Sequence, residues 1–231
     1  MNKNMLVIAA HPDDAEFTSG GSLTRWISEG WAVSLAICTD GGKGSHSSED
    51  DPAVLTKTRQ AEQEASARVL GIREVIWLGH PDGQLAQAAR QLEEQLTYLI
   101  RKVRPDRLLA WDAWKPYQLH PDHRTAGQAA MDAVLTAGNP HFYPDQLQQT
   151  PGLQPHQVGE VYLFGTDDPD EWVDITATFE RKMESIACHE SQVASLRDLA
   201  LQLSHCNRDR GVTRGYTYAE AFKVLHPFCD T

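Results

Sequence analysis

The segment Met5–Asp14, with the sequence MLVIAAHPDD, joins a short apolar run to a histidine and two aspartates. The apolar run at residues 5–9 has the length and β-branched content of a strand that is buried on both faces, as in a parallel sheet. Residues 16–29 then carry apolar side chains at helical spacing, and Gly30 is a typical helix stop. The segment therefore predicts a strand, a polar turn and a helix in succession.

The same alternation of apolar runs and helical periodicity continues along the chain. Further strands are predicted at residues 31–38, 74–78, 107–111, 161–164 and 172–175, and further helices at 57–70, 88–103, 121–136 and 176–190 and within the tail. Residues 39–54 and 139–158 are predicted to be irregular, because the first is rich in Gly, Ser and Asp and the second in Pro and Gln. Strands that alternate with helices predict an α/β fold with a mainly parallel sheet and a site at the carboxyl ends of its strands. The 231 residues suit a single domain, residues 1–231.

The net charge, the N-terminal apolar run and the spacing of the cysteines each argue against a class of partner or site. The formal net charge of −11 predicts an acidic surface that repels phosphate backbones, so no nucleic-acid partner is expected. The N-terminal apolar run is too short for a signal peptide or a membrane span, so we expect a cytoplasmic protein without membrane insertion. The scattered cysteines Cys38, Cys188, Cys206 and Cys229 predict no disulfide framework.

Two clusters of ionisable residues each follow a predicted strand, His11–Asp14 (HPDD) and His120–His123 (HPDH). Taken singly, either could be a loop whose carboxylates favour a helix N-terminus. Together they bring His and Asp side chains to one edge of the sheet, which is how catalytic zinc sites with open positions for water and substrate are built. The same ligands also suit other divalent first-row metals. The sequence lacks a GxGxxG turn after the first strand, a GxSxG elbow and a complete HExxH helix, which argues against other common chemistries.

The paired motifs resemble those of the PIG-L/LmbE family of metal-dependent deacetylases. That family includes the N-acetylglucosaminyl-phosphatidylinositol de-N-acetylases and the deacetylases of mycothiol and bacillithiol synthesis. Further segments that are similar to family motifs cover nearly the whole chain: Thr39–Gly41, Arg59–Gly71, Pro81–Gly83, His189–Gln192 and Tyr218–Phe222. The resemblance implies a Rossmann-like three-layer α/β sandwich with its active site at the C-terminal ends of the strands.

The resemblance also implies a role for residues of the first cluster and for the last residue of the second. His11, Asp14 and His123 would be the metal ligands, and Asp13 would be the general base. These roles agree with the chemistry of amide hydrolysis, because a bound divalent ion lowers the pKa of water to about 7 and a neighbouring carboxylate can take the proton.

Four more residues receive roles from the resemblance alone. His120 would stabilise the oxyanion or protonate the leaving amine, with Asp122 orienting it. Arg59 and Asp82 would contact the sugar. A departure from the family pattern lies two positions before His120, where mycothiol-branch members carry a tyrosine and this chain has Gln118, which argues against a mycothiol precursor.

The resemblance implies a zinc-dependent N-deacetylase, a hydrolase that removes acetyl from an N-acetylated amino sugar such as N-acetylglucosamine or from a glycoside of one. Another divalent first-row metal could take the place of zinc. Alternatives are an amidase of the same family that acts on a larger thiol or natural-product conjugate, and a binding protein that keeps the metal without turnover. The partner would be a small N-acetylated molecule, and the family resemblance implies a homo-oligomer.

Overall fold

The centre of the sheet is strand β1 (Lys3–Ala9), which forms from the apolar run at the start of the chain. In the computed structural model, which describes residues 3–45, 47–193 and 196–228, β1 lies between β2 (Trp31–Thr39) and β4 (Arg107–Trp111). It runs parallel to both neighbours. Its residues from Met5 onward are fully buried, as expected for a strand that is covered on both faces.

The described strands form one seven-stranded sheet in the order β3-β2-β1-β4-β5-β7-β6. The outer strands are β3 (Glu74–His80), β5 (Glu160–Phe164), β6 (Glu171–Asp174) and β7 (Ala219–Leu225). The five strands from β3 to β5 are parallel neighbours, and β7 is antiparallel to both β5 and β6. The prediction of a mainly parallel sheet is therefore confirmed. Strand β7 was not predicted, because its sequence AEAFKVL suits a helix as well as a strand.

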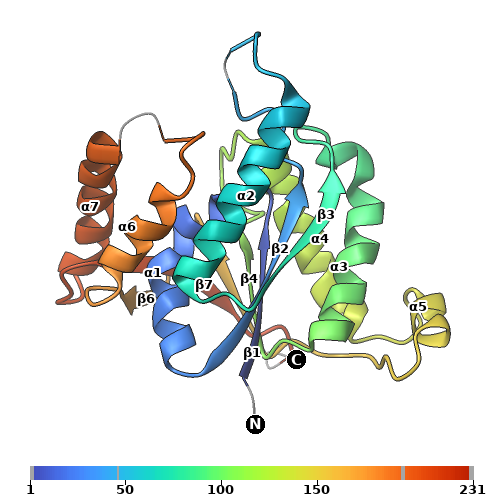
Figure 1. Cartoon of the computed structure of the whole chain (residues 1–231). Coiled ribbons are helices and arrows are strands. Elements are labelled where there is room, and N and C mark those ends of the chain that lie inside the picture. Colours follow the sequence, from blue (N-terminus) through green and yellow to red (C-terminus); the bar gives the residue numbers. More distant parts are fainter. Residues whose placement is uncertain (1–2, 46, 194–195, 229–231) are drawn as a thin grey trace.

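Helices cover both faces of the sheet (Figure 1). The helices of the described ranges are α1 (Asp14–Ser28), α2 (Pro52–Leu70), α3 (Ala89–Val103), α4 (Pro121–Ala137), α5 (Pro144–Gln149), α6 (Phe179–Ala187) and α7 (Leu196–Val212), with a 3-10 turn at Leu85–Ala88. The short helix α5 has no buried residue and lies away from the sheet (Figure 1). Alternate side chains of β1 face opposite layers. Leu6 and Ile8 share a core with apolar residues of α3 and α4, whereas Met5 and Val7 share one with residues of α1 and α2.

The first turn of α2 departs from the prediction. The helix begins at Pro52 rather than at residue 57, so the preceding loop is shorter than expected. The side chain of Asp51 accepts a hydrogen bond from the Ala53 amide at 2.8 Å. A capping aspartate followed by proline in the first helical position is a strong start signal that outweighs the polar composition of this stretch.

Two further expectations concern the membrane and the cysteines. Within the described ranges, no helix has both the length and the apolar character needed to cross a bilayer. The cysteines in these ranges, Cys38, Cys188 and Cys206, are free. Cys229 lies outside the described residues.

A buried ion pair fastens α1 to the C-terminal part of the chain. Lys182 Nζ lies 2.6 Å from Glu220 Oε1, and both side chains are 0% exposed. Glu220 also accepts hydrogen bonds from the amides of Gly21 at 3.1 Å and Ser22 at 2.7 Å, and Lys182 donates to the Phe17 carbonyl at 2.8 Å. The Phe17 carbonyl and the Gly21 amide are partners in a regular helix. The ion pair therefore satisfies backbone groups of α1 as well as its own charges.

We expect Glu220→Ala to lower the free energy of unfolding by about 3–5 kcal/mol, because it leaves the Lys182 ammonium buried without a counter-charge. Urea denaturation followed by circular dichroism measures the loss. Glu29→Ala is the matched control, since it removes the exposed ion pair between Glu29, which directly follows α1, and Arg25 of α1, whose side chains are 46% and 43% exposed. That control should cost less than about 1 kcal/mol. Equal losses in both variants would contradict the role of the buried pair.

Candidate active site

The residues singled out in the sequence come together at the carboxyl end of the sheet. His11 and Asp14 lie between β1 and the first turn of α1, His120 and His123 lie at the start of α4, and Asp82 follows β3. They border a cavity of about 450 Å³. The cavity is lined by His11, Asp13, Asp14, Lys43, Gly44, Arg59, Asp82, Gly83, His120, Pro121, His123 and Gln192. Parallel strands end at one edge of a sheet, which is why segments so far apart in the sequence meet here.

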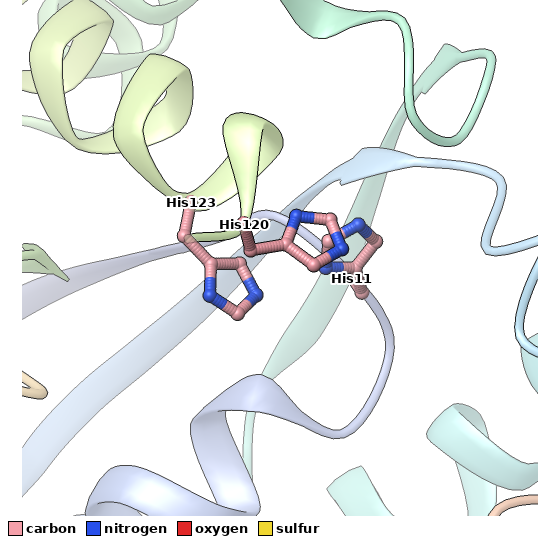
Figure 2. Close-up of side chains that lie close together, drawn as sticks. All are labelled: His11, His120 and His123. Atoms are coloured by element: carbon pink, nitrogen blue, oxygen red, sulfur yellow. The ribbon is translucent and has the colours of Figure 1, made fainter. Parts of the chain in front are cut away.

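Three imidazole rings gather at this edge (Figure 2). The ring centroids of His11 and His120 lie 4.5 Å apart, those of His120 and His123 4.4 Å, and those of His11 and His123 5.2 Å. His120 and His123 are on one side of the first turn of α4, as their spacing predicted. A nitrogen of each ring lies within 4.8 Å of the others, a separation at which one cation can bind all three.

The carboxylate of Asp14 lies between two of these histidines. Its Oδ2 accepts hydrogen bonds from the amides of Ala10 and His11, both at 2.9 Å, and from Trp111 Nε1 at 3.0 Å. Its Oδ1 lies 3.4 Å from His123 Nε2. Burial raises the pKa of this carboxyl, but the contacts with His11 and His123 outweigh burial and hold the pKa well below its usual range. Asp14 is therefore ionised, with Oδ1 on the side of His123.

His11 is surrounded by carboxylates. Its Nε2 lies 3.2 Å from Asp82 Oδ1 and 3.3 Å from Asp122 Oδ2, and its Nδ1 lies 3.7 Å from Asp14 Oδ2. Burial lowers the pKa of the ring, but the contacts with Asp122, Asp14 and Asp82 outweigh it and raise the pKa to about 12. The three carboxylates around this ring make its surroundings strongly negative, and such surroundings attract a cation. The atoms of His11, Asp82 and Asp122 also form a second group within 4.8 Å of one another.

Asp122 is connected to both histidine clusters. Its carboxylate is fully buried and accepts hydrogen bonds from the amides of Gly83 at 2.6 Å and Leu85 at 3.2 Å, besides the contact with His11. Its backbone amide donates to His120 Nδ1 at 3.2 Å. The link from Asp122 to His120 thus runs through the main chain, while the carboxylate positions His11.

His120 is the N-cap of α4 and accepts that amide with its ring. Since Nδ1 is the acceptor, the proton of the neutral ring is on Nε2. Burial lowers the pKa of His120, and the charges of His11 and His123 lower it further. The residue is therefore a neutral hydrogen-bond donor near pH 7.

Asp13 has an unusual backbone conformation. Its φ is 90° and its ψ −25°, in the left-handed region, and its side chain does not cap α1. The amide of Asp13 donates to Gln63 Oε1 at 3.0 Å, and its Oδ2 accepts from Arg59 Nη2 at 3.1 Å. Burial and the charge of Asp14 raise the pKa of this carboxyl to about 7, although Arg59 opposes the shift. Such a conformation costs about 1–3 kcal/mol and persists only where neighbours impose it.

Arg59 and Gln63, which hold Asp13, belong to one buried polar face of α2. Arg59, Gln63 and Ser66 recur at helical spacing and are buried, although they are polar. Arg59 also donates to the carbonyls of Gly41 at 2.9 Å and Pro12 at 2.7 Å, and its side chain is only 4% exposed. Arg59 borders the cavity, but most of its donors already bind the chain.

Gln63, which joins the Asp13 amide to Glu16, is a buried neighbour of the site that the sequence did not single out. Gln63 Nε2 and Ser66 Oγ each donate to Glu16 Oε1 at 2.7 Å. His189 is fully buried, and its Nε2 lies 3.8 Å from the same oxygen. The only sequence signal was a row of polar residues on α2, and such a row is more often a solvated face.

The His189–Gln192 segment lies against α2 and borders the cavity through Gln192. The amide and hydroxyl of Ser191 both donate to the carboxylate of Glu62, each at 2.7 Å. Gln192 then lines the cavity beside Gly44. The hydrogen bonds of Ser191 to Glu62 of α2 thus place Gln192 at the edge of the cavity.

The sequence and the fold are similar to those of known proteins. The profile of the PIG-L family, described as GlcNAc-PI de-N-acetylase, matches residues 6–134. The chain is 33% identical to a diacetylchitobiose deacetylase of Thermococcus kodakarensis over 96% of this chain and 83% of the relative. It is 26% identical to a 1D-myo-inositol 2-acetamido-2-deoxy-α-D-glucopyranoside deacetylase of Catenulispora acidiphila over 83% of this chain and 76% of the relative. The structure is similar to that of the N,N'-diacetylchitobiose deacetylase of Pyrococcus horikoshii, with a TM-score of 0.91 and 32% identity over 99% of this chain and 88% of the other.

We expect Gln63→Leu to lower the free energy of unfolding by about 2–3 kcal/mol, because it leaves the Asp13 amide and Glu16 Oε1 each short of a partner in a buried place. Chemical denaturation measures the change. Gln60→Leu, the same substitution at a half-buried position of α2, is the control and should have a much smaller effect. If both variants lose the same stability, Gln63 does not hold the strained backbone.

Proposed function

This chain belongs to the PIG-L family of GlcNAc-PI de-N-acetylases, and from that premise we propose that it removes the acetyl group from an N-acetylated amino sugar or from a glycoside of one. The observation that carries the proposal is the meeting of Asp13, Asp14 and three imidazoles in one polar cavity. The reaction adds water across an amide. The water oxygen bonds to the carbonyl carbon, the C–N bond breaks, and acetate and a free amine are released.

We propose that His11, Asp14 and His123 hold a divalent cation. The donor set supports this, because Asp14 Oδ2 is saturated by N–H donors while Oδ1 faces His123. Two imidazoles and one carboxylate are a common ligand set for catalytic zinc, so zinc is our first choice, and other divalent first-row metals suit the same ligands. A cation held there would supply a Lewis acid for the amide carbonyl and would lower the pKa of water.

Asp13 is assigned the role of general base. Its pKa of about 7 is well suited to taking a proton from water and passing it to the amine nitrogen when the C–N bond breaks. Arg59 fixes one carboxylate oxygen, Oδ2, at 3.1 Å. The other oxygen is then left for the water.

His120 is assigned to the developing negative charge on the carbonyl oxygen. Its Nδ1 is engaged by the Asp122 amide, so its Nε2–H is the donor that remains. A fixed N–H donor aimed at a developing oxyanion stabilises the transition state more than the ground state.

Arg59 and Asp82 border the cavity, and we propose that sugar hydroxyls meet them there. Both side chains also bind protein atoms. Asp82 Oδ2 accepts the Lys43 amide at 3.0 Å, and its Oδ1 lies 3.2 Å from His11. In this proposal each residue has two roles: it holds neighbouring residues of the site in place, and it contacts the substrate.

The experiment for the proposal measures release of free amine from N-acetylglucosamine, its α- and β-glycosides, diacetylchitobiose and an inositol glycoside. We expect the zinc-loaded wild type to deacetylate at least one of them. Asp13→Asn should lower kcat by about 10²–10⁴-fold, because it removes the base without changing the shape of the side chain. Asp132→Asn, at an exposed position of α4, should retain the full rate. If none of these compounds is hydrolysed while metal is bound, the substrate is a different amide or the protein only binds its ligand. A full rate in Asp13→Asn would show that another group is the base.

Removal of the metal gives a separate prediction. Dialysis against a chelator should abolish amine release, and added Zn²⁺ should restore it and raise the melting temperature. At a hundredfold excess over the dissociation constant, binding stabilises the fold by about 2.7 kcal/mol. His123→Ala should lose both effects, whereas His141→Ala, at an exposed position, should keep them. Metal content measured by atomic emission together with calorimetry reports the outcome. Undiminished zinc binding by His123→Ala would remove His123 from the ligand set.

A further inference from the structure

We propose that Trp111 is a positioning residue of the metal centre, because the same indole hydrogen-bonds one proposed ligand, Asp14, and stacks on another, His123. The inference rests on the proposed function, since it concerns the side chains that would hold the cation. Trp111 is the last residue of β4, and it is absent from the cavity lining. Its effect would therefore reach the reaction through the ligands and not through the substrate.

The contact with Asp14 decides which carboxylate oxygen is free. Trp111 Nε1 donates to Oδ2 at 3.0 Å, beside the amides of Ala10 and His11. An indole N–H is a donor only, so this bond requires an oxygen that accepts. With Oδ2 engaged by N–H donors, the carboxylate cannot rotate without breaking several hydrogen bonds. Oδ1 stays on the side of His123.

The contact with His123 fixes the plane of the imidazole. The two ring centroids lie 3.9 Å apart with an interplanar angle of 12°, which is a stacked arrangement. On its other side, His123 stacks on His120 at 4.4 Å and 21°. A ring held between two parallel rings keeps its nitrogens in a defined plane, in which Nε2 lies 3.4 Å from Asp14 Oδ1.

The indole is itself held rigidly. Phe164, the neighbour of Trp111 in the sheet, meets it edge-on with centroids 5.0 Å apart. The next residue is Gly165, with φ of +69°, and a Cβ there would come within 2.4 Å of Trp111 Cζ3. The glycine therefore leaves the space that the indole fills. A support built in this way can transmit its geometry to the ligands, as outer partners of metal ligands do.

The test compares Zn²⁺ affinity in wild type, Trp111→Phe and Trp111→Leu by competition with a chelator of known affinity. Trp111→Phe keeps an aromatic face against His123 and loses the N–H to Asp14, whereas Trp111→Leu loses both. We expect Trp111→Phe to weaken the Kd by about 10- to 100-fold and Trp111→Leu to weaken it further. Trp114→Phe is the control, because Trp114 lies in the following loop with 59% exposure, and it should bind like wild type.

A second readout is the visible absorption spectrum of the Co²⁺-loaded proteins, which reports ligand geometry independently of turnover. We expect a changed spectrum for Trp111→Phe and the wild-type spectrum for Trp114→Phe. If Trp111→Phe does not fold, Trp111→Tyr takes its place in both measurements. Wild-type affinity and an unchanged spectrum in the folded variant would overturn the inference and leave the proposed function intact. Failure of the wild type to bind Zn²⁺ or Co²⁺ would overturn both.

Discussion

The Asp14 carboxylate is the interaction on which the arrangement of the site depends. Its Oδ2 binds the two amides of the turn after β1 and the indole at the end of β4, and its Oδ1 faces His123 on α4. One buried side chain thus ties together the end of β1, the start of α1, the end of β4 and the start of α4. Because a buried carboxylate must have its oxygens satisfied, each of these segments has a defined place relative to the others.

A second constraint is the density of negative charge at this edge of the sheet. Asp14, Asp82 and Asp122 lie around His11, and Asp13 borders the same cavity. Burial of so many carboxylates is costly unless positive charge accompanies them. Protonated His11 offsets part of this negative charge, which explains why the pKa of its ring is raised. A divalent cation would meet the same need more completely. The feature that makes the site costly for the fold is therefore also the feature that suits it to metal binding.

The motifs that carry the family resemblance fall into two groups with different physical tasks. The His-Pro-Asp-Asp and His-Pro-Asp-His motifs bring the proposed metal ligands and the proposed acid–base groups to the cavity. The Tyr218–Phe222 motif acts on the fold, because Glu220 and Lys182 satisfy backbone groups of α1 away from the cavity. The helix α2 combines both tasks, since its buried polar face holds the strained backbone of Asp13 and packs α2 against α1.

Sequence alone determined most of the order of strands and helices, because burial on both faces and helical periodicity are local patterns. The short helix α5 lies in a stretch that was predicted to be irregular. The sequence also determined that both histidine clusters lie at one edge of the sheet, since the carboxyl ends of parallel strands share that edge. It did not reveal strand β7 or the early start of α2, which depend on partners and capping that periodicity does not report. Only the tertiary structure decided that the Asp122 carboxylate meets His11, that Arg59 holds Asp13 and that Trp111 supports Asp14. These contacts join segments that are distant in the sequence, and their directions are set by how the helices pack on the sheet. The amino-acid sequence contains no local signal for that packing.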